Sequence, residues 1–179
     1  MKRVMMILFV CCAGIGLSSG AEAEVIDKIL AVLDEELILL SEVREFAAKP
    51  VNQIVANLEH SSDVDRDALD YLIEQRLLQR EIKYLAFPKE PERVLSVVME
   101  YMSATYHDGD IQSLTRQLQQ RGIPQTALET ALELYMKGVD YIRRKYRFNA
   151  DSNDPEVVLN LFQQLVRELR TKADIHTSF

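Results

Sequence analysis

Apolar residues recur at helical spacing along most of the chain, and prolines and a glycine divide this pattern into segments. Apolar residues at positions i, i+3, i+4 and i+7 line one face of a helix, so each segment predicts an amphipathic helix. Four of the five prolines stand between segments, where a helix should break in any case. The chain is therefore expected to be mostly α, with about six helices. They are predicted over 41–58, 63–82, 92–106, 111–121, 128–146 and 155–169.

Before the first helix, two short apolar runs predict a β-hairpin. The runs cover 29–33 and 37–40, and the residues between them fit a tight turn. Ser41 follows the second run, and we expect its hydroxyl to cap the next helix by accepting from a first-turn amide. Pro50 lies inside the apolar pattern of that helix, which should therefore be kinked or split there.

The first 23 residues have the pattern of a cleaved signal peptide. Lys2 and Arg3 precede an uncharged apolar run of 14 residues, and Ala21-Glu22-Ala23 has the A-x-A form of a signal-peptidase site. The run is shorter than the ~20 residues of a membrane-spanning helix. We therefore expect export, cleavage after Ala23, and a mature domain over 24–179.

Cleavage would also remove both cysteines of the chain, Cys11 and Cys12. A lipid anchor on one of them is the alternative, although both lie inside the apolar run with no small residues before them. The mature chain has no disulfide, thiolate nucleophile or cysteine-metal site. It keeps 19 basic and 27 acidic residues, a net charge of −8, which argues against nucleic acid or another polyanion as the main partner.

Two patterns imitate functional sites but have simpler interpretations. Gly16–Gly20 matches G-x-S-x-G, yet it lies in the segment predicted to be cleaved. The aspartates of 63–67 imitate a calcium loop, but Ala68 replaces the required glycine, and carboxylates also suit a helix N-terminus. We predict no metal site, no cofactor and no catalytic residues. The histidines have no partners at metal-ligand spacing and are expected to be solvated: His60, His107 and His176.

Methionine and tyrosine side chains suit adaptable surfaces that accept varied polypeptides. The alternative is that most of those in this chain pack in the core. The basic run 143–147 has two interpretations as well, an anionic ligand or the negative end of a helix dipole. Six residues are the candidates for client binding: Tyr101, Met102, Tyr106, Tyr135, Met136 and Tyr141.

Four segments of the mature chain together resemble a known family. Residues 25–43 are similar to that family's opening hairpin, turn and Ser-capped helix, and 68–78 to its second helix. Residues 118–142 resemble its next helical pair, and 165–175 its C-terminal helix and closing strand. The family is that of SurA-like periplasmic chaperones, and the resemblance is to their N-terminal domain. One departure is the turn, where the family often has Asn-Gly in place of Asp34-Glu35.

The resemblance implies a single domain completed by the C-terminal helix, acting in the periplasm as an ATP-independent chaperone for unfolded or outer-membrane-bound polypeptides. Members of the family carry one or two parvulin prolyl-isomerase domains where this chain has only 149–153, so no isomerase activity is expected. The expected partners are unfolded or partly folded envelope proteins, with homodimerisation left open and no stable membrane insertion after cleavage. A dedicated structural adaptor of one envelope complex is the alternative function, and an enzyme ranks last.

Overall fold

The structure, a computed structural model, describes residues 27–148 and 154–178. The signal peptide predicted for 1–23, with its cleavage site, lies outside the described residues. Within the described ranges the chain is mostly helical, with eight α-helices, one short 3₁₀-helix and three strands. In chain order these are β1 Ile29–Leu33, β2 Glu36–Leu39, α1 Leu40–Ala48, α2 Pro50–Val55, η1 Leu58–His60, α3 Val64–Ile82, α4 Pro91–Tyr106, α5 Ile111–Gln120, α6 Gln125–Ala131, α7 Glu133–Lys145, α8 Pro155–Lys172 and β3 Ile175–Thr177.

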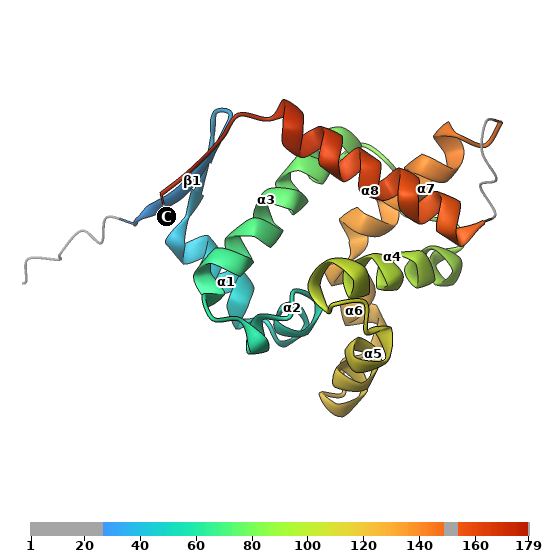
Figure 1. Cartoon of the computed structure of the whole chain (residues 1–179), viewed down its shortest axis with the longest axis horizontal. Coiled ribbons are helices and arrows are strands. Elements are labelled where there is room, and N and C mark those ends of the chain that lie inside the picture. The colour runs from blue at the N-terminus through green and yellow to red at the C-terminus, as the bar shows by residue number, and fades with distance from the viewer. Residues whose placement is uncertain (1–26, 149–153, 179) are drawn as a thin grey trace, which may run out of the picture.

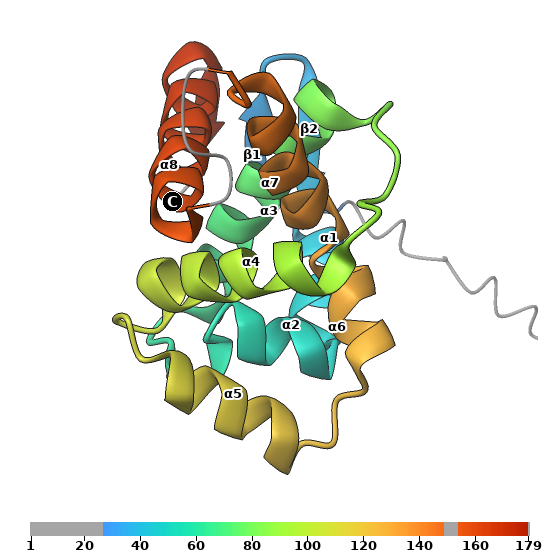
Figure 2. The same ribbon diagram turned by 90° about the vertical axis from the view of Figure 1, so that its right-hand side faces the viewer.

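The helices pack around α3, which at 19 residues is the longest and contacts α1, α7 and α8. Helix α8 crosses α4 and α7 on one side of the molecule (Figure 1). The small sheet and α5 lie far apart, with the sheet at the upper left and α5 at the bottom of the view (Figure 1). A view from the side shows α2, α4 and α6 between α5 and the rest of the helices (Figure 2).

The predicted hairpin is confirmed, and a third strand joins it. Strands β1 and β2 pair antiparallel, with Leu33 opposite Glu36, and Asp34 in the turn has a φ of 53°. Strand β3 pairs antiparallel with the other edge of β1, so the strand order is β2-β1-β3. The Asp34 carboxylate accepts from the Asp174 amide at 2.9 Å, which ties the turn to the C-terminal segment. The two ends of the described chain therefore meet in one sheet.

The predicted capping role of Ser41 is wrong. Helix α1 begins at Leu40, and Glu42 accepts from the Leu39 amide at 3.0 Å. The amide of Ser41 donates to the carboxylate of Asp27 at 3.2 Å. The Ser41 hydroxyl donates to the other oxygen of the same carboxylate. These hydrogen bonds lower the pKa of the Asp27 carboxyl group. Ser41 therefore lies inside the first turn, where two acids, Asp27 and Glu42, accept from the amides of Ser41 and Leu39.

Two of the predicted helices are each divided into two. Pro50 splits the first into α1 and α2, as its position inside the apolar pattern predicted. The predicted helix over 128–146 is also broken, at Leu132, which the sequence pattern did not indicate. Leu132 is fully buried, with φ −100° and ψ 8°. The apolar pattern runs through this break because α6 and α7 both bury residues on its two sides, Leu128 and Tyr135.

Three helix ends lie within one residue of the predicted bounds: the starts of α3 and α8 and the end of α5. Asp63 caps α3 by accepting from the Arg66 amide at 3.2 Å, so the aspartates of 63–67 belong to a helix N-terminus. Asp154 caps α8 in the same way, with Pro155 at the first helical position. Gly122, with a φ of 61°, ends α5, and the next amide donates to the Leu118 carbonyl at 3.0 Å.

His107 is not solvated, contrary to the prediction. It is 6% exposed, and its Nε2 lies 2.8 Å from the carbonyl oxygen of Ile54. Burial lowers the pKa of the imidazole. The partner carbonyl comes from α2, which is distant in sequence, so the local polar stretch around His107 carried no sign of it.

The C-terminal helix belongs to the core, as its apolar stripe predicted. Phe162 is fully buried, and its ring centroid lies 4.9 Å from that of Tyr101 and 6.4 Å from that of Tyr135. Gly138 on α7 lets this ring approach the backbone closely. The buried residues of α8 are Val158, Phe162, Leu165 and Val166, with Leu161 and Leu169 partly buried beside them.

Candidate functional site

The six residues predicted for client binding lie mainly in the core. Tyr101, Met102, Tyr135 and Met136 are each at most 3% exposed. The other two are half-buried: Tyr106, and Tyr141, over whose ring the Lys145 amine lies 5.3 Å from the centroid. Four of the six therefore pack in the core in the described conformation, and their role in client binding stays a prediction.

Tyr101 and Tyr106 do border one cavity, together with a buried carboxyl group on α3. The cavity has a volume of about 430 Å³ and lies between α3, α4 and α8. Glu74 in its wall is 3% exposed, and the Tyr101 hydroxyl donates to Glu74 Oε1 at 2.7 Å. The aromatic rings of Tyr71 and Tyr135 pack against each other at a tilt of 51°, with centroids 5.6 Å apart, and the Tyr135 ring lies 5.8 Å from that of Tyr101. The carboxyl group is therefore enclosed by aromatic side chains.

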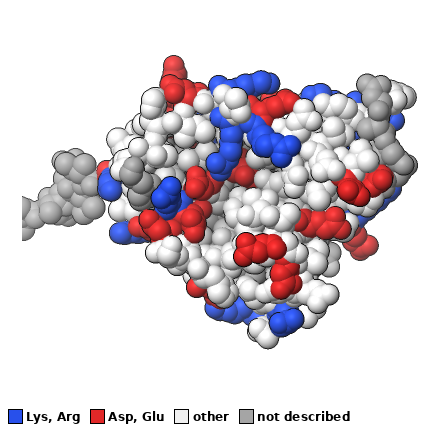
Figure 3. Space-filling view, in the orientation of Figure 1, with Lys and Arg blue, Asp and Glu red and all other residues white. Residues whose placement is uncertain are grey.

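Burial raises the pKa of Glu74, although the hydrogen bond from Tyr101 and the charge of Arg170 act in the opposite direction. Arg170, from α8, donates to the backbone oxygen of Asp70 at 2.9 Å and stands at the rim of the cavity. Basic side chains gather over the C-terminal half of α8, with acidic side chains beside them (Figure 3). The cavity thus combines a carboxyl group that holds its proton to higher pH with a guanidinium group at the rim.

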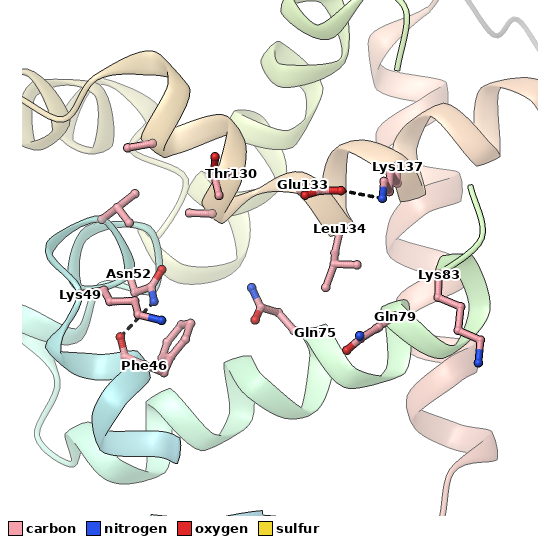
Figure 4. A pocket seen from close by; sticks show the side chains of 13 residues that line it. Phe46, Lys49, Asn52, Gln75, Gln79, Lys83, Thr130, Glu133, Leu134 and Lys137 are labelled. Atoms are coloured by element: carbon pink, nitrogen blue, oxygen red, sulfur yellow. Dashed lines mark hydrogen bonds and ion pairs between the residues drawn. The ribbon is translucent and has the colours of Figure 1, made fainter. Parts of the chain in front are cut away.

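A larger groove lies between α1–α2, α3 and α6–α7, and its volume is about 520 Å³ (Figure 4). We call it the amide groove, because three side-chain amides line it together with apolar side chains. The amides belong to Asn52, Gln75 and Gln79. The other lining residues are Phe46, Lys49, Val51, Lys83, Ala127, Thr130, Ala131, Glu133, Leu134 and Lys137.

Helical spacing and the Pro50 break together position the amides. Gln75 and Gln79 stand one turn apart on α3, and Figure 4 shows Gln75 pointing into the groove. Asn52 follows Pro50 in α2, is 6% exposed, and donates from Nδ2 to the Phe46 carbonyl at 3.0 Å. This hydrogen bond fixes the angle between α1 and α2, and with it one wall of the groove.

Charged side chains stand around the groove. Lys49 pairs with Glu45 at 3.4 Å, and Lys137 pairs with Glu133 at 2.6 Å across one helical turn (Figure 4). Between them the wall is apolar, formed by side chains such as Leu134. Side-chain amides both donate and accept hydrogen bonds, as a peptide backbone does. The amide groove therefore offers hydrogen-bonding partners for a backbone and apolar surface for side chains.

Apart from Tyr101 and Tyr106, sequence reasoning missed the residues of both sites, although two of them carry a local signal. Tyr71, Glu74 and Leu78 are spaced three and four residues apart, so helical spacing alone places Glu74 on the buried face of α3. A carboxylate on such a face marks a candidate site. Asn52 is a similar exception, an amide inside an apolar pattern. The groove as a whole has no sequence signal, because its walls come from segments far apart in the chain.

Two further findings concern metal ligands and membrane-spanning helices. Across residues 27–148 and 154–178, no three His, Cys, Asp or Glu side chains are grouped so that they could hold a metal ion. Each helix in the same ranges is too short or too polar to pass through a lipid bilayer.

Comparison of the chain with protein-family models, with curated proteins and with solved structures found no match. The resemblance to SurA-like chaperones therefore rests on the sequence segments named above, and the family assignment stays a prediction.

Proposed function

We propose that the mature chain is an ATP-independent periplasmic chaperone that holds extended segments of unfolded envelope proteins in the amide groove. The observation that carries this proposal is the lining of the groove, in which amides on two separate helices stand among apolar side chains. The resemblance of the sequence to SurA-like chaperones supports the same function. The proposed chaperone has no prolyl-isomerase activity.

The chemistry of the groove suits a partner defined by its backbone more than by its sequence. An unfolded segment exposes amide and carbonyl groups at every residue, and Gln75 and Gln79 can pair with either kind. Its apolar side chains can contact Phe46 and Leu134. The volume of about 520 Å³ lies within the range of about 300–1,000 Å³ that is usual for ligand clefts. Such a groove favours weak binding of many sequences over tight binding of one.

The test is suppression of aggregation. The purified mature chain, at several-fold excess, should slow the aggregation of an unfolded β-rich polypeptide without ATP, and it should not accelerate a proline-limited refolding step. A bulky side chain at the groove wall should abolish the suppression. Thr130→Trp is suited to this, since Thr130 is exposed, lines the groove, and donates only to the Thr126 carbonyl one turn away.

Thr115→Trp is the matched control. Thr115 is also exposed and also donates to the carbonyl four residues before it, at 2.8 Å, but it lies on α5 outside the groove. Equal loss of activity in both variants, or no suppression by the parent chain, would contradict the proposal. A chain that binds one folded envelope protein and no unfolded polypeptide would instead be the dedicated adaptor.

A further inference from the structure

One end of the molecule carries a charge opposite to that of the chain as a whole. The full chain has a net charge of −7. The residues 81–93, around the loop between α3 and α4, and 140–148, at the end of α7, together hold seven basic and four acidic residues, a net +3. The rest of the chain therefore carries −10. This separation of charge gives the protein a positive end.

The two segments meet in space. A cavity of about 450 Å³ is lined by Lys89 and Glu90 from the start of α4 and by Asp140, Arg143, Arg144 and Arg147 from the end of α7. Figure 2 shows the α3–α4 loop and the end of α7 on the face turned toward the viewer. Every side chain that lines this cavity is charged, and four of the six are basic. An arginine guanidinium group matches the geometry of a phosphate group.

Exposed aromatic side chains accompany these basic residues. Tyr84 is 89% exposed, Phe148 is 82% exposed and Phe87 is 40% exposed. The guanidinium group of Arg147 lies 4.4 Å from the centroid of the Phe148 ring, and the Lys83 amine lies 4.8 Å from that of Tyr84. We call this surface the basic–aromatic end and define it by Tyr84, Phe87, Lys89, Arg144, Arg147 and Phe148.

Intramolecular interactions explain only part of this surface. Arg144 pairs with Asp140, and basic residues at the end of α7 complement its dipole. Within the described residues, however, Lys89 and Arg147 have no carboxylate partner, and Lys89 lies outside α7. A helix dipole also gives no reason for aromatic rings to stand in water. The combination instead matches the residues that bind the surface of an anionic bilayer, where basic groups meet phosphates and aromatic rings enter the headgroup layer.

We propose that the basic–aromatic end binds the surface of anionic phospholipid bilayers. A flat bilayer would touch this end alone. Most of the acidic remainder would then lie more than one Debye length, about 8 Å, from the lipid charges. A long polyanion such as a nucleic acid would extend beyond this end and would be repelled by the acidic remainder of the chain. Binding at this end is independent of whether the amide groove holds unfolded polypeptides.

The experiment is sedimentation of the mature chain with lipid vesicles. The chain should bind vesicles of phosphatidylcholine containing about one third phosphatidylglycerol, should not bind vesicles of phosphatidylcholine alone, and should be released by salt. Each basic residue near such a surface contributes about fivefold to the partition coefficient. The double variant Lys89→Gln with Arg147→Gln should therefore bind about 25-fold more weakly. Its control is Arg66→Gln with Arg116→Gln, two exposed arginines elsewhere, which should change binding by less than about twofold.

A second pair of variants tests the aromatic contribution. Tyr84→Ser with Phe148→Ser should weaken binding at least about tenfold, since two aromatic side chains would no longer enter the headgroup layer. The control, Val64→Ser with Ile111→Ser, removes two exposed apolar side chains elsewhere and should have little effect. Absence of binding to anionic vesicles overturns the proposal, as does equal weakening by a control pair. Binding to an acidic soluble protein but not to vesicles overturns it too.

Discussion

Helices α7 and α8 approach each other closely at Gly138, because glycine has only a hydrogen atom where other residues have a Cβ. A Cβ atom placed there would lie 2.6 Å from Cε2 and 3.4 Å from Cζ of Phe162. Real Cβ atoms essentially never lie within 3.0 Å of a heavy atom from elsewhere in the fold. The ring cannot turn aside easily, because Phe162 is fully buried and its centroid lies 4.9 Å from that of Tyr101. We therefore predict that Gly138→Ala destabilises the protein.

Two opposing effects set the magnitude. Alanine is favoured over glycine inside a helix by about 1 kcal/mol, which would stabilise α7. Overpacking a well-filled core costs about 1–3 kcal/mol, and a rigid aromatic ring places this site in the upper part of that range. The net expectation is a loss of about 1–2 kcal/mol in the free energy of unfolding. With a urea m-value of about 2 kcal/mol/M, the midpoint should fall by about 0.5–1 M.

Urea unfolding of four proteins would test this reasoning: the parent, Gly138→Ala, Phe162→Leu and the double variant. Leucine lacks the ring atom that the new methyl group would meet. In the Phe162→Leu background, Gly138→Ala should therefore cost nothing or stabilise slightly, which gives a coupling energy of at least about 1 kcal/mol. The reasoning is refuted if Gly138→Ala costs the same in both backgrounds, or if it leaves the parent's midpoint unchanged.

Two further predictions concern Glu74 and the N-terminus. Because burial raises the folded-state pKa of Glu74 above its ordinary value of 4.5, the folded state binds this proton more tightly, and the resulting stability is lost as pH rises toward the folded-state pKa. Glu74→Gln, which keeps an acceptor for the Tyr101 hydroxyl, should gain stability relative to the parent by up to about 1.4 kcal/mol per pH unit in that window, as measured by urea unfolding at several pH values. A flat difference between the two proteins across pH would contradict the assignment. The protein recovered from the cell envelope should have the intact mass of a chain that begins at Glu24, whereas a retained signal peptide or a lipid on Cys11 or Cys12 would refute the predicted cleavage.

Much of the fold was predictable because its signals are local. Helices α3, α4, α5 and α8 each bury one stripe, and an acidic cap or a proline marks the start of most of them. The hairpin was equally clear, because two apolar runs flank a short polar turn. Resemblance to a chaperone family added the closing strand, which local pattern alone does not reveal in three residues.

The errors share one physical cause, which is a partner distant in sequence. Ser41 donates to Asp27, 14 residues earlier, so it is not a cap. His107 is buried, and the Ile54 carbonyl oxygen, 53 residues away, lies 2.8 Å from its Nε2. The break at Leu132 is of the same kind, since a fully buried leucine packs there without any glycine or proline to mark it. The candidate groove was unpredictable for this reason too, because Asn52 and Leu134 meet only after the helices have packed.

The closing role of α8 leads to a stronger test of the fold. This helix buries four apolar side chains, each worth about 1.5–3 kcal/mol, against a typical total stability of about 5–15 kcal/mol. Truncation after Asn153 would expose the aromatic cluster around Tyr101 and would remove β3 from the edge of β1. The truncated chain should therefore be insoluble or lack a cooperative thermal transition in circular dichroism. A peptide covering 154–178, added to the truncated chain during refolding, should restore that transition, because the missing contacts need not be covalently linked. A truncated chain that stays soluble and melts as cooperatively as the full mature protein would show α8 to be an appendage.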